Sequence, residues 1–130
     1  AASTQPLLVL SKPEFIEAVQ DGLRNYTRTD ALHNNPLLRS RLVVEQLSTQ
    51  ATNGEKISCL QSVIKQAAES LQSSPRDEKL YRAVNRTYLH PAPTQEQAAE
   101  LLDLPFSTYR RHLKAGIARI GEILWQREIG

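Results

Sequence analysis

Apolar side chains recur at intervals of three and four residues along most of this chain, which is the spacing of one face of an α-helix. The pattern predicts six helices, separated by polar or proline-containing segments. They span approximately residues 12–26, 36–47, 54–71, 76–89, 95–102 and 107–127. No run of residues alternates with the period of two that marks a strand. The expected fold class is therefore all-α, a multi-helix bundle.

Capping residues indicate where several of these helices begin. Ser11 can cap the first helix, which carries Pro13 at an early position where the missing N–H costs little. Asn35 and Pro36 open the second helix, and its apolar residues are too many for one narrow stripe, so we expect this helix to be central. Residues 27–35 are predicted to form a polar connector.

The last third of the chain carries a short and a long helix pattern joined by a turn. Thr94 can cap the shorter helix, and Gln97 follows three residues later, as in a capping box. This pattern stops before Pro105, because the residue that precedes proline is disfavoured in the α conformation. Ser107 can cap the long helix. Together with the helix at residues 76–89, these elements predict a tri-helical helix-turn-helix unit, which places its second helix in the DNA major groove.

Small side chains suit the packing of this unit. Ala99 in the shorter helix and Gly116 in the long helix permit a close approach of the two, and Leu104 in the turn can fill the space between them. The spacing also predicts which face of the long helix is buried. That face carries Tyr109, Leu113, Gly116, Ile117, Ile120 and Leu124.

The opposite face of the long helix is basic. Residues 107–119 include four Arg or Lys and no acid, although residues 91–130 balance five basic against five acidic side chains. Such a cluster can contact phosphates, and Arg can also read guanine through two hydrogen bonds. Surfaces are rich in Lys and Arg, so an ordinary solvated face is the alternative interpretation. We expect double-stranded DNA to contact Ser107, Thr108, Arg110, Arg111 and Lys114.

This segment resembles the helix-turn-helix of region four of bacterial sigma factors and of related response-regulator output domains. The resemblance is carried by Ala-Ala-Glu-Leu-Leu-Asp-Leu at residues 98–104 and Ser-Thr-Tyr-Arg-Arg-His-Leu-Lys-Ala-Gly-Ile-Ala-Arg-Ile at residues 107–120, in register without an insertion. It implies a bacterial transcription regulator whose second helix enters the major groove, with Phe106 added to the contacts named above. Residues 94–124 are also similar to the C-terminal ends of some large bacterial ATP-binding regulators.

The turn departs from the family's pattern in two places, at Asp103 and at the pair Pro105-Phe106. Asp103 stands where the family usually has Gly, although Asp tolerates the left-handed conformation better than most residues do. Pro105 and Phe106 replace a short polar pair. The alternative function is therefore a helical protein-interaction or oligomerisation module of a larger regulator, with Phe106, Tyr109 and Trp125 as docking residues. A lone Trp such as Trp125 is, however, more often part of a core.

Other classes of function find little support in the sequence. The chain has no phosphate-binding loop, no nucleophile elbow and no His-Glu-x-x-His motif, so we expect neither an enzyme nor a cofactor. We expect no metal site, because His33, His90 and His112 are far apart, and Cys59 is interpreted as an inert thiol. Residues 1–6 do not resemble a signal peptide, and no apolar run is long enough to span a membrane, which favours a cytoplasmic location.

Length and composition limit the domain organisation. With 130 residues, 40% of them apolar, the chain can bury one core or two small ones that share an interface. The likeliest domain boundary, a weak one, lies near Pro75. We therefore expect a helical scaffold at residues 1–75 and the helix-turn-helix unit at residues 76–130, with one compact domain as the alternative. The formal net charge of +2 means that any contact with DNA is local. Because the chain has no methionine, even at position one, we expect a domain of a longer protein, with a processed chain as the alternative.

Overall fold

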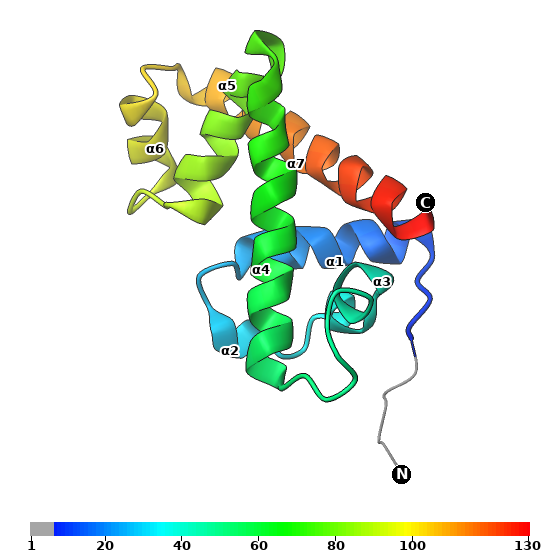
Figure 1. Cartoon of the computed structure of the whole chain (residues 1–130). Helices are drawn as coiled ribbons and strands as arrows, with labels where there is room; N and C mark the ends of the chain where they lie inside the picture. Colours follow the sequence, from blue (N-terminus) through cyan, green and yellow to red (C-terminus); the bar gives the residue numbers. More distant parts are fainter. Residues whose placement is uncertain (1–6) are drawn as a thin grey trace.

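The computed structural model describes residues 7–130, and within this range it contains helices and no strand (Figure 1). The all-α prediction is confirmed. Residues 1–6, where the sequence predicts no signal peptide, lie outside the described residues. The elements follow one another as α1 (Lys12–Arg24), α2 (Thr29–Leu32), η1 (Pro36–Arg39), α3 (Arg41–Val44), α4 (Asn53–Glu69), η2 (Ser70–Ser73), α5 (Pro75–Val84), η3 (Asn85–Leu89), α6 (Gln95–Leu101) and α7 (Phe106–Ile129).

The long helix α7 is the element against which most of the others pack. It contacts α5, α1, α4, α3 and α6, and Figure 1 shows it running from the end of the molecule that holds α5 and α6 to the C-terminus. Its buried residues follow the predicted three- and four-residue spacing, and Tyr109, Ile120 and Leu124 have no exposed surface. Ile117, predicted on the same face, is half-buried. One side of α7 therefore belongs to the core along its whole length.

The helices α1 and α4 supply much of the remaining core. The predicted Ser11 cap is confirmed and forms a full capping box with Glu14, and Thr52 forms the same box with Glu55 at the start of α4. A single hydrophobic cluster contains residues from both sides of position 75. Its members from α1 and α4 are Phe15, Ala18, Val19, Leu23, Ile57, Leu60, Val63, Ile64, Ala67 and Ala68.

The prediction of one helix over residues 36–47 is wrong. The chain forms η1 and α3 instead, and Ser40 lies between them in an extended conformation (φ −81°, ψ 165°). The Ser40 hydroxyl donates to the Leu37 carbonyl (2.6 Å). The carboxylate of Glu128, near the end of α7, accepts from the first two N–H groups of α3 (3.1 and 3.0 Å). A distant acid thus satisfies N–H groups that a new helix leaves without partners, which makes the break possible.

Two other segments also differ from the predicted pattern. The polar connector at residues 27–35 contains the short helix α2, whose Leu32 is buried. The helix predicted over residues 76–89 begins at Pro75 and changes into the π-helix η3 after Val84. In η3 the Thr87 hydroxyl is hydrogen-bonded to both the Ala83 carbonyl and the Tyr109 hydroxyl of α7. Contact with α7 therefore accompanies the change of helix type, and short π segments are frequent at functional sites.

The close approach expected from Gly116 occurs with a different helix than predicted. A Cβ atom at Gly116 would lie 2.7 Å from Val84 Cγ2 and 3.0 Å from the Leu80 carbonyl oxygen, both in α5. Gly116 therefore faces α5, whereas the sequence pattern paired it with Ala99 of α6. Because one of these neighbours is backbone, it cannot move aside as a flexible side chain would.

We predict that Gly116→Ala lowers the free energy of unfolding by about 1–3 kcal/mol, because the added methyl overpacks the α5–α7 contact. Gly54→Ala is the matched control, since its added Cβ would meet only Thr52 Oγ1, at 3.8 Å, and alanine favours a helix. Urea unfolding of the two variants measures the difference. A Gly116→Ala protein as stable as the wild type would contradict this packing.

Candidate nucleic-acid interface

The turn between α6 and α7 consists of residues 102–105. Asp103 has a φ of 55°, the one positive value of a non-glycine residue within the described range. Its N–H donates to the Glu100 carbonyl, and the Leu104 N–H donates to the Ala99 carbonyl, both at 3.0 Å. These two bonds form a Schellman motif, which places a left-handed residue directly after a helix. Leu104 is half-buried against the core.

The predicted Thr94 cap of α6 is confirmed, but its capping box and the predicted start of α7 are not. The Thr94 hydroxyl accepts from the Gln97 N–H (3.1 Å), and within residues 7–130 no bond returns from the Thr94 N–H to the Gln97 side chain. The predicted cap of α7 at Ser107 is wrong, because the helix already begins at Phe106 and Pro105 occupies the cap position without a side-chain hydrogen bond. Proline fixes its own φ near the helical value, so the chain turns into α7 early. Ser107 thus lies exposed in the first turn.

The predicted DNA-contacting residues lie together along the first three turns of α7. Ser107, Arg110, Arg111 and Lys114 are exposed, and Thr108 is half-buried. At about 100° per residue, their face lies opposite the buried one. Among the described residues, none of the three cations takes part in an ion pair, whereas five other Lys or Arg side chains do. The positive charge of this face is therefore not neutralised within the described part of the protein.

Of the three aromatic residues named as docking candidates, Tyr109 is fully buried, so its predicted docking role is wrong. Phe106 and Trp125 do not form one surface. The Phe106 side chain is 37% exposed, and its ring lies 5.9 Å from that of Tyr109 and 5.8 Å from the guanidinium of Arg110. Trp125 is half-buried with its ring edge-on to Phe15, at 5.2 Å between centroids. Nineteen residues of helix place the two backbones about 28 Å apart. Trp125 is thus part of the packing between α7 and α1.

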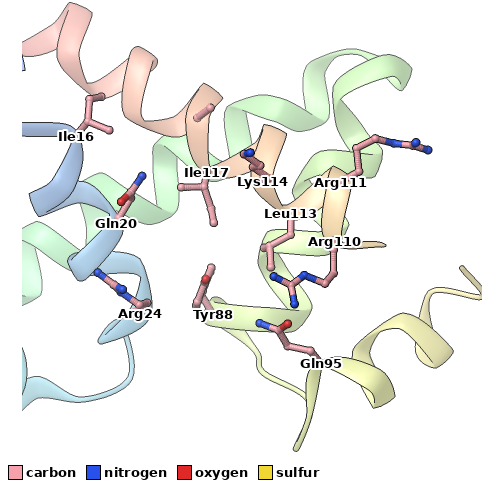
Figure 2. A pocket seen from close by; sticks show the side chains of 11 residues that line it. Ile16, Gln20, Arg24, Tyr88, Gln95, Arg110, Arg111, Leu113, Lys114 and Ile117 are labelled. Atoms are coloured by element: carbon pink, nitrogen blue, oxygen red, sulfur yellow. The ribbon is translucent and has the colours of Figure 1, made fainter. Parts of the chain in front are cut away.

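A hollow of about 630 Å³ runs beside the basic face, between α1 and the N-terminal half of α7 (Figure 2). We call it the α1–α7 groove. Its apolar lining comes from Ile16, Leu113, Ile117 and Ala118. Its polar lining comes from Gln20, Arg24, Tyr88, Gln95, Arg110, Arg111 and Lys114. Among residues 7–130, no carboxylate lines it. The sequence interpretation missed Arg24 and Gln20, although their four-residue spacing after Ile16 places all three on one edge of α1.

A second hollow, of about 770 Å³, lies on the other side of α7, against the start of α5. Its cationic lining consists of Arg76, Lys79, Arg111 and Arg119, and its one carboxylate, Asp77, lies 3.8 Å from Arg119. His112 also lines it, and its Nδ1 atom is buried without a hydrogen-bond partner within residues 7–130. Burial lowers the pKa of His112, and the charges of Lys79 and Arg111 lower it further. The exposed face of α7 therefore has positive surroundings on both sides.

No family model, curated protein or solved structure matches this chain. The resemblance to region four of sigma factors consequently stays a prediction. Within the described range, no group of three His, Cys, Asp or Glu side chains is placed to hold a metal ion. None of the described helices is both long enough and apolar enough to cross a membrane.

We predict that Asp103→Gly raises the free energy of unfolding by about 0.5–1 kcal/mol, because glycine adopts a positive φ without the steric cost that a Cβ atom imposes. The control is Glu100→Gly, inside α6. It should lower the free energy of unfolding by about 1 kcal/mol, because glycine is a poor helix former. Thermal and urea unfolding distinguish the two. If both substitutions are destabilising, the left-handed turn at Asp103 is not formed.

Proposed function

We propose that this chain is a DNA-binding domain of a transcription regulator, in which α5, α6 and α7 act as a tri-helical helix-turn-helix unit. In this proposal the exposed side of the N-terminal half of α7 enters the major groove. The observation that carries it is the group of three exposed cations, Arg110, Arg111 and Lys114, which form no ion pair with any described residue and lie directly after the left-handed turn at Asp103.

The arrangement of side chains on α7 suits the chemistry of such a contact. The major groove is about 12 Å wide and admits one helix, and the phosphates of both strands lie along its edges. Arg111 and Lys114 project from the outer side of α7, where they can contact base edges or phosphates. The Ser107 hydroxyl lies in the first turn, where the leading N–H groups of α7 have no side-chain cap and can contribute to phosphate binding.

The basic hollows on the two sides of α7 strengthen this proposal. Within the part of the chain that the structure describes, the lining of the α1–α7 groove includes four cations and no acid, and that of the second hollow includes four cations and one acid. Duplex DNA carries a negative charge for about every 1.7 Å of its length, so a helix in the major groove meets phosphates on both sides. The formal net charge of the chain is only +2, which makes this local concentration the relevant quantity.

A protein-interaction module is the second candidate function. Its support is the exposure of two apolar side chains close to the turn, Phe106 at 37% and Leu101 at 61%. The Phe106 ring, however, already lies against Tyr109 and below the Arg110 guanidinium. Binding to an apolar partner surface would depend weakly on salt, whereas binding to phosphates would weaken steeply as salt increases.

We predict that the wild-type chain binds short DNA duplexes with an affinity that falls steeply between low and physiological salt. Replacing both Arg110 and Arg111 by Ala should reduce the slope of log K against log[salt] by about two units, because each lost phosphate contact removes about 0.9 unit. The matched control replaces Arg28 and Arg127, two exposed cations outside this surface, and should leave the slope unchanged. Fluorescence anisotropy of a labelled duplex measures all three proteins.

Two results would contradict the DNA-binding proposal. One is the failure of the wild-type chain to bind any duplex at micromolar concentration in low salt. The other is an equal slope for the Arg110 and Arg111 double variant and for the control double variant. Binding of a protein partner that Phe106→Ala abolishes, with no response to salt, would favour the second candidate function instead.

A further inference from the structure

The α1–α7 groove combines two segments that are far apart in the sequence. One wall carries Gln20 and Arg24 of α1, and the other carries Arg110 and Lys114 of α7. Arg24 and Arg110 are 86 residues apart in the sequence. Tyr88 of the π-helix η3 lies between them, as Figure 2 shows. The groove forms where α1 and α7 pack together, and the polar side chains beside this contact lie at its rim.

The chemistry of this lining is that of a phosphate site. Every ionisable side chain at the groove, apart from the Tyr88 phenol, is a cation, and Gln20 and Gln95 add neutral amide donors. Arginine holds phosphate oxygens through two parallel hydrogen bonds, and the hydroxyl of the half-buried Tyr88 is a further donor in the same groove. The apolar residues of the lining reduce competition from water for a bound anion.

Arg24 is placed to act in this groove. Burial raises the pKa of Tyr88, the neighbouring Tyr109 raises it further, and the charge of Arg24 opposes both effects, so Arg24 lies close enough to influence the groove. Arg24 is paired with Asp21 on the same helix, but its side chain is 58% exposed. Exposed ion pairs of this kind contribute little stability, so the guanidinium can turn toward a phosphate at small cost.

The position of the groove favours a polymer over a small anion. It is open along one side and continues directly onto the exposed face of α7, since Arg111 and Lys114 belong to both. In Figure 2 the Arg111 side chain points away from the groove, toward the outer side of α7. A strand that follows the exposed face of α7 would therefore lie next to the groove, whose far wall belongs to α1.

We infer that the α1–α7 groove holds the backbone of one DNA strand, and that Arg24 of α1 contacts one of its phosphates. This inference rests on the proposed function, and it adds that the scaffold half takes part in DNA binding. The helix-turn-helix unit alone then supplies only part of the binding surface. The register of the strand is set by two arginines on opposite walls, Arg24 and Arg110.

The test compares Arg24→Gln with Arg28→Gln in the full chain. Both substitutions remove one positive charge from an exposed side chain, but Arg28 does not line the groove. Arg24→Gln should reduce the salt slope of duplex binding by about one unit and weaken the affinity roughly five- to tenfold near 0.1 M salt. Arg28→Gln should leave the slope unchanged. Circular dichroism verifies that both variants fold.

The outcomes separate this inference from the proposed function. If the wild-type chain binds duplexes and the two variants have equal slopes, the scaffold does not contact DNA and the inference is wrong, while the proposed function stands. If inorganic phosphate alone still shifts the NMR signal of Tyr88 in that case, the groove serves a small anion instead. Failure of the wild-type chain to bind duplexes at low salt overturns both.

Discussion

The packing of α7 against α5 is the contact on which the rest of this structure depends. Gly116 brings the two helices so close that no side chain fits between them, and Tyr109 reaches the π-helix η3 through the Thr87 hydroxyl. Once this side of α7 is buried, helical geometry determines which residues point outward. The exposed cations Arg111 and Lys114 therefore owe their position to apolar contacts on the opposite side.

The same helix connects the two halves of the chain. Its N-terminal part packs with α5 and α6, and its later turns contact α1, α4 and α3, where Glu128 caps the first N–H groups of α3. The α1–α7 groove is a consequence of this continuity, since it lies where α1 meets the basic part of α7. A surface that includes Arg24 is thus available only when both halves are folded together.

Local patterns in the sequence predicted most helices and the buried side of α7, because capping and apolar spacing act over a few residues. Thr94 caps α6, Asp103 adopts the left-handed conformation, and Tyr109 lies on the predicted buried face of α7. The errors arose where distant groups decide the local structure. The break at Ser40 is accompanied by hydrogen bonds from the first N–H groups of α3 to the Glu128 carboxylate, and the groove needs Arg24 beside residues that follow much later in the chain. Such pairings have no signature in a single sequence.

Whether the exposed side of α7 is a DNA-binding surface can be measured by an NMR titration of the isotope-labelled chain with a short duplex. If it is, the largest changes in amide shifts occur at residues 106–118, at the groove side of α1 and at the start of α5. The end of the molecule that holds α2 and α3 should change little. Changes concentrated around α2 and α3, or none at low salt, would show that DNA does not bind through α7.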